Sequence, residues 1–233
     1  MWNGKKKALT FSYDDAVSQD IRLIEIFNKY GLKGTFNINS MLLGQSTTLV
    51  RDGIEITHNK NKPEDVPYIY TGHEVSAHTL THPHLPALSD KDIIYQIEQD
   101  RLNLSDLVGY EVCGMAYPGS APNHNQRIIY LVRNNTGIKY ARTVETTLCF
   151  DQQKDLHCVR GTLYHHEQWN KLFEMGQRFL DAEEGQFYIW GHAYEFDIFP
   201  ERWTIFEEFC QMMSGKTDIF YGTNKEVLLP CSE

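Results

Sequence analysis

Two hydrophobic periods alternate along the chain. Short runs rich in β-branched and aromatic residues recur between longer segments in which apolar residues repeat every three or four positions. The short runs predict strands at 8–13, 34–39, 74–77, 112–117, 139–144, 157–160, 187–191 and 218–221. The longer segments predict a helix ending at Gly31, a long helix after Ser89, and helices at about 125–133, 167–181 and 201–213.

Capping residues mark where the first two helices begin. Asp20 is expected to cap the first, whose apolar stripe ends before Gly31. Ser89 is expected to cap the second, with Asp92 three residues later. Residues 44–72 follow neither period and are polar, so they are expected to form an irregular loop insertion that could be a lid or a substrate rim.

Seven or eight strands separated by helices favour a parallel α/β barrel, with a doubly wound open sheet as the alternative. The polar residues decide between them, because they gather at or just after the carboxyl ends of the predicted strands. These residues are Asp14, Asp15, Asn39, His78, Tyr117, Arg142, Glu145 and His192. In barrels of this kind that rim carries the active site, so the barrel is preferred.

Composition and charge narrow the function. The 233 residues are expected to form one domain, and the net charge of −9 argues against a nucleic-acid binder. No apolar run approaches the roughly 20 residues of a membrane span. No signal peptide precedes the first strand, which predicts a cytoplasmic protein. Five cysteines without CxxC spacing suit a reducing compartment; they are Cys113, Cys149, Cys158, Cys210 and Cys231.

A metal site is predicted from two motifs. His78 and His82 are four residues apart, a spacing that places both imidazoles on one face of a helical turn. The pair Asp14-Asp15 ends the first strand. One carboxylate would complete a two-histidine, one-carboxylate set, and the other would be free to act as a base. The alternative is a surface HxxxH and a turn-forming Asp-Asp.

A third motif supplies an acid. Ile189-Trp190-Gly191 is an apolar strand that ends in His192. Hydrolysis of an amide or ester at a metal needs a cation, a base, an oxyanion donor and an acid, and His192 is suited to the last role. Glu195 or Asp197 could fix the tautomer of His192. Alone, His192 would be read as a capping or supporting histidine.

At this point the chain resembles the polysaccharide deacetylases of the NodB-homology type, carbohydrate esterases that remove acetyl groups from sugars. The resemblance spans Leu9 to about Asn224. Residues 10–15 (TFSYDD) are similar to the family's TFDD motif, residues 78–82 (HTLTH) to its H(S/T)xxH motif, and residues 189–192 (IWGH) to its last motif.

The resemblance implies a distorted (β/α) barrel and a role for each motif residue. Asp14 would be the base, and His192 would protonate the departing amine. The metal ligands would be Asp15, His78 and His82. The metal would be one divalent transition ion, zinc first, with cobalt or nickel as substitutes. The substrate would be an acylated sugar or oligosaccharide; the oligomeric state is left open.

The chain departs from the family in its third motif, often RxPYG. Here residues 116–120 read Ala-Tyr-Pro-Gly-Ser, without the arginine and with glycine in place of the aromatic residue. The backbone N–H of Gly119 could still stabilise an oxyanion. Arg142 is proposed as the substitute partner of Asp14, with a salt bridge to Glu145 as the alternative.

Other aromatic and histidine residues complete the list of candidates. Tyr117, Trp190 and Tyr194 could bind a sugar, although most aromatic residues serve packing. The fourth family motif has no clear match; Trp169 and His165-His166 could contribute. Two alternative functions stay open, an amidase for a small non-sugar N-acyl or ureide compound, and a carbohydrate-binding homologue without turnover.

Overall fold

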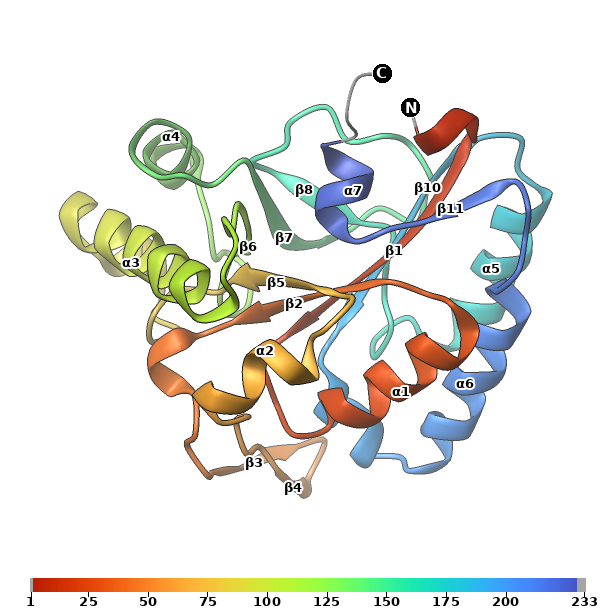
Figure 1. Ribbon diagram of the computed structural model, residues 1–233, viewed down its shortest axis with the longest axis horizontal. Coiled ribbons are helices and arrows are strands. Elements are labelled where there is room, and N and C mark those ends of the chain that lie inside the picture. The colour runs from red at the N-terminus through yellow and green to blue at the C-terminus, as the bar shows by residue number, and fades with distance from the viewer. Residues whose placement is uncertain (1, 230–233) are drawn as a thin grey trace.

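A nine-stranded parallel sheet forms the centre of the computed structural model, which describes residues 2–229 (Figure 1). Eight strands follow one another in the order β8-β7-β6-β5-β2-β1-β10-β9, and β11 pairs with β1 outside this path. The strands are β1 (Lys7–Asp14), β2 (Gly34–Ile38), β5 (Glu74–Ala77), β6 (Gly114–Ala116), β7 (Tyr140–Thr146), β8 (Val159–Gly161), β9 (Leu163–Tyr164), β10 (Gly185–Gly191) and β11 (Ile219–Tyr221).

The two ends of this order meet, which makes the sheet a nearly closed barrel. β8 and β9 are the terminal strands, and in the chain only Thr162 separates them. The Thr162 N–H donates to the Tyr188 carbonyl on β10 at 2.7 Å, so the chain passes from one edge to the other without a gap in bonding. The predicted parallel barrel is confirmed, and the open doubly wound sheet is excluded because its edges would stay apart.

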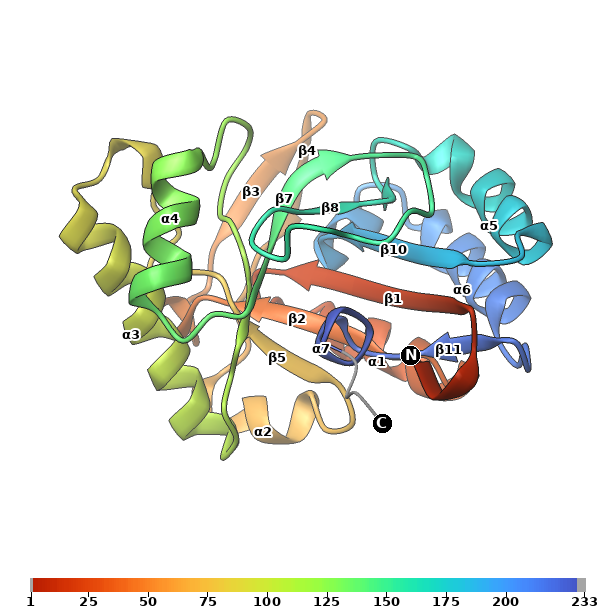
Figure 2. The ribbon, with the colours of Figure 1, turned by 90° about the horizontal axis from the view of Figure 1, so that it is seen from above.

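Helices surround the barrel in two groups (Figures 1 and 2). α3 (Asp90–Val108) and α4 (Gln126–Asn135) pack on one side, and α1 (Asp20–Tyr30), α5 (Leu172–Asp181) and α6 (Glu201–Met213) on the other. A short helix that was not predicted, α7 (Asn224–Leu228), lies at the amino ends of the strands, where the Lys225 N–H donates to Glu74. This end of the barrel is therefore covered, and the carboxyl ends remain for the site.

Aromatic packing fixes the helices α1 and α6 against β1. Phe11 lies 4.6 Å from Phe27 of α1, between ring centroids, and meets Phe206 of α6 at 6.2 Å. All three rings are fully buried. Burial of such side chains contributes about 2–3 kcal/mol each, so these contacts hold the strand that ends in Asp14 in place.

The helix-cap predictions had mixed outcomes. The Ser89 hydroxyl accepts the Asp92 N–H, as predicted. The cap at Asp20 was wrong, because Gln19 occupies the N-cap position and Asp20 is the first residue of α1. The Asp20 side chain points into the protein instead, where it accepts a hydrogen bond from the Tyr70 hydroxyl at 2.7 Å.

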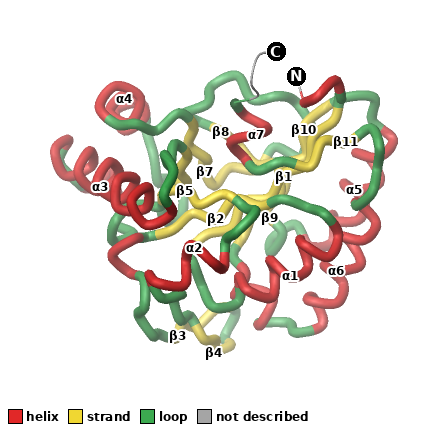
Figure 3. Tube along the Cα trace, viewed as in Figure 1, coloured by secondary structure: helices red, strands yellow, loops and turns green. Residues whose placement is uncertain are grey.

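Residues 44–72 are not an irregular loop. They contain an antiparallel hairpin, β3 (Thr48–Arg51) and β4 (Ile54–Thr57), and the short helix α2 (Val66–Ile69). Asp52-Gly53 makes the hairpin turn with φ values of +51° and +78°, the conformation that Asp-Gly pairs favour between strands. That dipeptide was the signal in the sequence. Figure 3 shows the hairpin as a separate two-stranded unit apart from the barrel strands.

Four of the cysteines are free thiols, namely Cys113, Cys149, Cys158 and Cys210; Cys231 lies outside the described residues. Within residues 2–229, no helix combines the length and apolar character that a bilayer crossing demands.

Candidate active site

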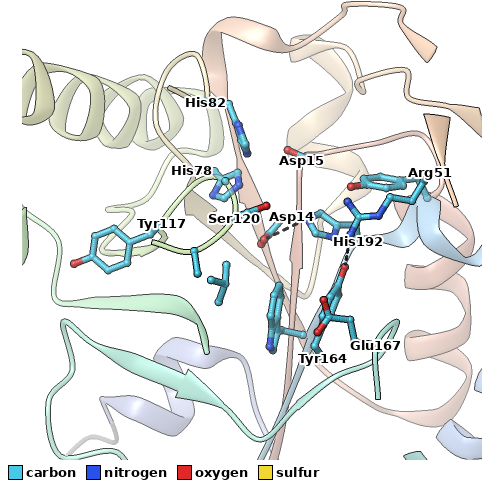
Figure 4. Close-up of a pocket in the computed structure, with 15 residues that line it drawn as sticks. Asp14, Asp15, Arg51, His78, His82, Tyr117, Ser120, Tyr164, Glu167 and His192 are labelled. Atoms are coloured by element: carbon cyan, nitrogen blue, oxygen red, sulfur yellow. Dashed lines mark hydrogen bonds and ion pairs between the residues drawn. The ribbon is translucent and has the colours of Figure 1, made fainter. Parts of the chain in front are cut away.

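A cavity of about 370 Å³ opens at the carboxyl ends of the barrel strands (Figure 4). Its size falls in the ordinary range for small-ligand pockets. The residues that line it are Asp14, Asp15, Arg51, His78, His82, Tyr117, Gly119, Ser120, Ala121, Val144, Tyr164, Glu167, Trp190, His192 and Tyr194. The fold thus brings together the three proposed metal ligands, Asp14, Gly119, His192 and the three proposed sugar-binding aromatic residues. Arg142 does not line the cavity but binds Asp14, which does.

Asp15, His78 and His82 form a cluster suited to a cation. One potential ligand atom from each residue lies within 4.8 Å of the others. The histidines do not share a helical turn, however, and that part of the prediction was wrong. Thr79 and His82 have φ values of +70° and +57°, so the segment is a loop folded back on itself. The imidazoles still converge, with ring centroids 4.9 Å apart.

Buried side chains hold this loop in its unusual conformation. The Asp100 carboxylate on α3 accepts the Ser40 N–H at 2.8 Å and the His78 N–H at 2.9 Å. The Asn39 amide donates to the carbonyls of His78 and Thr79. Since positive φ at a non-glycine residue costs free energy, these bonds offset the strain that directs His78 and His82 toward one point.

The protonation of His78 also fits a metal ligand. Its Nδ1 lies 2.8 Å from the Ala116 carbonyl, so Nδ1 carries the hydrogen and Nε2 keeps a lone pair. Burial lowers the pKa of His78 to about 4, which keeps the ring neutral near pH 7. A neutral imidazole with one fixed tautomer is the form that binds zinc.

Asp15 is contacted by two residues of the 44–72 segment that no sequence pattern had placed there. His58 Nε2 lies 3.3 Å from Asp15 Oδ2, and Lys60 Nζ lies 3.4 Å from Oδ1. Burial by itself raises the pKa of Asp15, but His58 and Lys60 outweigh it and hold that pKa well below its usual range. Asp15 is therefore an ionised carboxylate.

Backbone pairing explains how these two residues reach the site. The Ser18 N–H donates to the Asn59 carbonyl at 2.8 Å, and the Asn61 N–H donates to the Ala16 carbonyl at 2.8 Å. Residues 59–61 are thus hydrogen-bonded alongside residues 16–18, which follow Asp15 in the chain. The φ of Asp15 is +85°.

Asp14 is bound by Arg142, the contact proposed from the sequence. Arg142 Nη2 donates to both carboxylate oxygens, at 2.6 and 2.5 Å, and the Asn37 amide donates to Oδ1 at 2.8 Å. The guanidinium is fully buried over the ring of Trp190, 4.5 Å from its centroid. The alternative, a salt bridge from Arg142 to Glu145, is not formed.

These contacts set the charge of Asp14. Burial raises the pKa of Asp14. The positive charge of Arg142, followed by His78 and His192, lowers it by more, so the pKa lies below its ordinary value. Asp14 is thus an ionised carboxylate with a fixed orientation, beside the cluster of Asp15, His78 and His82 but not a member of it.

His192 stands on the other side of Asp14, with its Nε2 3.8 Å from Asp14 Oδ2. Its Nδ1 lies 3.2 Å from Oε1 of Glu195, which is fully buried. Of the two acids considered for this position, Glu195 is the one in place; Asp197 instead accepts the Trp203 indole N–H. Burial lowers the pKa of His192, but Glu195, Asp14 and Asp15 raise it above its ordinary value, which favours a ring that carries a proton.

The remaining candidates differ in their exposure to the cavity. Gly119, with φ +80°, lines the cavity wall. The Tyr117 hydroxyl donates to the His157 carbonyl, pointing away from the site, and Trp190 stacks on Tyr164 at 4.2 Å. Tyr117, Trp190 and Tyr194 are each 5% exposed or less, so they contribute mainly packing.

The residues at 165–169 lie around the site without entering it. His165 Nε2 lies 3.1 Å from Glu195, and His166 pairs with Asp52 at the hairpin turn. Trp169 lies under the Arg202 guanidinium. Arg51, Lys60 and Asp100 all matter to the geometry, yet no periodicity or motif identifies them, because each acts across distant segments.

Comparison with solved structures shows where this fold occurs. A family 4 carbohydrate esterase from Streptomyces lividans, in complex with acetate, is similar with a TM-score of 0.57 and 15% identity, covering 94% of this chain and 93% of that one. The Xyl-CE4 domain of a multidomain xylanase from the hindgut metagenome of Trinervitermes trinervoides has a TM-score of 0.59 and 17% identity, with 96% and 90% covered.

A third similar structure is a family 4 pseudoenzyme from Bacillus anthracis, with a TM-score of 0.57 and 14% identity, covering 96% of this chain and 66% of that one. At such identities the likeness concerns the fold alone. Among curated proteins, no sequence matches the chain.

The family comparison goes further, because it rests on the sequence. Residues 2–141 match the model of the polysaccharide deacetylase family. This range holds the Asp14-Asp15 pair and both histidines of the cluster, and ends before Arg142 and His192. The match spans more than half of the chain and the fold agrees with it, so the chain belongs to the polysaccharide deacetylase family.

Proposed function

We propose that this protein is a metal-dependent deacetylase that hydrolyses the acetyl group of an N-acetylated or O-acetylated carbohydrate. The observation that carries the proposal is the placement of Asp14. Arg142 holds its carboxylate between the cluster of Asp15, His78 and His82 on one side and His192 on the other. A base, an acid and a cation site thus face one cavity.

The donor set fits one divalent transition metal, zinc first. Two imidazoles and an ionised carboxylate are borderline ligands that zinc accepts, and three protein ligands leave a position for water or substrate. When bound by Asp15, His78 and His82, such an ion would polarise the acetyl carbonyl and acidify water.

Each residue of the chain has a distinct part in the reaction. Asp14 accepts the proton of the attacking water on a carboxylate oxygen, while Arg142 keeps the carboxylate oriented. The Gly119 N–H donates to the oxygen that gains negative charge. His192 Nε2 delivers a proton to the nitrogen or oxygen that leaves the acetyl group, and Glu195 at Nδ1 stabilises the protonated ring.

Replacement of Asp14 by Asn tests the proposal. The variant keeps the shape of the side chain and loses the base, so acetate release from acetylated oligosaccharides should fall about 10²- to 10⁴-fold while zinc content is retained. Asp65→Asn, an exposed acid of the 44–72 segment, serves as the control. Loss of zinc together with activity in Asp14→Asn would show that Asp14 is a ligand rather than the base.

A further inference from the structure

The hairpin β3–β4 places a cation on the wall of the cavity. Arg51 is the last residue of β3 and lines the cavity, with 40% of its side chain exposed. Among the residues that line this cavity within the described chain, it is the only lysine or arginine. Lys60 and Arg142 are buried against Asp15 and Asp14 and do not line the cavity.

Only one nitrogen of the Arg51 guanidinium, Nη2, has partners among residues 2–229. Nη2 donates to the Tyr164 hydroxyl at 3.1 Å and lies 3.5 Å from Oε1 of Glu195. No partner for Nε or Nη1 is found within residues 2–229. Tyr164 and His192 already bind the same Glu195 oxygen, so Arg51 is not needed to neutralise it. The donors that remain can bind a carboxylate or a phosphate group from the cavity.

The position of Arg51 assigns it to one part of the substrate. Arg51 and His192 approach the same oxygen of Glu195, and in Figure 4 Arg51 lies beside His192, away from His78 and His82. Since His192 protonates the leaving group in the proposed function, Arg51 faces the sugar rather than the acetyl carbonyl.

The hairpin that carries Arg51 is fixed to the barrel. At its turn, Asp52 pairs with His166 at 3.0 Å, and Arg202 contacts the other nitrogen of that ring at 3.2 Å. On the opposite strand, the Thr57 carbonyl accepts the Gln19 amide at 2.9 Å. The guanidinium therefore projects from an element that is anchored at its turn and on its second strand, which reduces the entropy lost when it binds a ligand.

We propose that Arg51 is a specificity residue that selects an acidic substrate, an acylated sugar that carries a carboxylate or phosphate group next to the acylated position. The inference rests on the proposed function, since it names the substrate class of the same site.

Substrate pairs test it directly. Acetate release is measured on an N-acetylated amino-sugar oligomer in neutral form, and on matched forms that carry a carboxylate or a phosphate. Wild type should favour an acidic form about tenfold or more in kcat/KM, mainly through KM, and the preferred form identifies the group. Arg51→Met should abolish the preference, and Arg51→Lys should restore part of it.

Two control variants separate recognition from loosening of the hairpin and from general charge. Asp52→Asn breaks the pair with His166 and keeps the Arg51 charge. Lys62→Gln removes an exposed cation of the same segment. Both should retain the acidic preference. An equal preference in Arg51→Met and wild type would overturn the inference, and so would an equal loss in Asp52→Asn.

Binding measured without turnover keeps this inference distinct from the proposed function. In the Asp14→Asn background, calorimetry should show tighter binding of the acidic oligomer than of the neutral one, and the difference should vanish on adding Arg51→Met. If binding shows this selectivity but the protein with Asp14 intact hydrolyses none of the oligomers, the proposed function is overturned and the inference about Arg51 stands. Hydrolysis without selectivity would overturn only the inference.

Discussion

The rim of the barrel and the 44–72 segment contribute to the same cavity in different ways. On the rim, Asp14 and His78 end buried strands or follow them directly, and buried neighbours bind each one. In the 44–72 segment, most of the hairpin is exposed. The segment lines the cavity with Arg51 and contacts Asp15 with Lys60.

This difference suggests that the barrel rim carries the proposed catalytic groups, whereas the 44–72 segment changes how strongly the site binds its ligands. Groups that must keep an exact protonation state and direction sit on the barrel, where several hydrogen bonds determine each position. The 44–72 segment adds positive charge at two points, one against Asp15, the proposed metal ligand, and one in the cavity wall. We therefore expect barrel-side changes to cost stability and metal binding together, and segment-side changes to alter affinity with the fold preserved.

The largest effect is expected from Asp100→Ala on the barrel side. This change removes the acceptor of the Ser40 N–H and one acceptor of the His78 N–H, both in a buried place. Urea unfolding should show a loss of about 3 kcal/mol, and zinc affinity should fall at least about tenfold. Asp106→Ala, an exposed acid on the same helix, is the matched control. If Asp100→Ala were destabilised but bound zinc with unchanged affinity, Asp100 would not be needed to position His78 and His82 for metal binding.

A smaller effect on the free energy of unfolding is expected from a substitution at His73, where the 44–72 segment rejoins the barrel. Its Nδ1 accepts the Gly34 N–H at 3.1 Å, and burial lowers its pKa to about 4. Because the pKa of His73 is lower in the folded protein than in the unfolded chain, where it is about 6.5, neutral His73 stabilises the fold fully above pH 6.5. This contribution is lost as the pH falls toward 4.

His73→Asn keeps an acceptor near Nδ1 without titrating. The free energy of unfolding should therefore fall less between pH 7 and pH 4 in this variant, by about 2 kcal/mol relative to wild type. Denaturant titrations across that range measure the difference. Parallel curves for the two proteins would contradict the assignment.

Lys60→Met should give the smallest effect and the opposite sign. Lys60 places a positive charge 3.4 Å from Asp15, the proposed metal ligand, and this charge would oppose a divalent cation there. Its removal should tighten zinc binding about tenfold in a titration with a competing chelator. Lys62→Met controls for net charge. Weaker zinc binding in Lys60→Met would mean that the lysine supports the site and that the two regions do not differ as described.

Much of the fold could be predicted because local patterns encode it. The strand–helix alternation and the cap at Ser89 were read correctly, since periodicity and capping depend on neighbours in the chain. The hairpin at residues 48–57 was missed even though Asp52-Gly53 signals a turn and Ile54-Glu55-Ile56-Thr57 alternates, because its strands are only four residues long and stand in a polar segment. The cap at Asp20 failed because a tertiary hydrogen bond to Tyr70 outweighed a local preference.

The sequence by itself determined the parallel barrel and the grouping of polar residues at the strand ends, and it offered two possible pairings for Arg142, with Asp14 or with Glu145. All three follow from the order of strands and from which residue ends each one. Only the tertiary structure decided that Arg142 pairs with Asp14, that Glu195 rather than Asp197 stands behind His192, and that Asp100 holds the histidine loop. It also decided that Arg51 lines the cavity and that Lys60 contacts Asp15. The physical reason is that these contacts join segments whose distance depends on loop paths and strand register, and neither leaves a periodic trace in the chain.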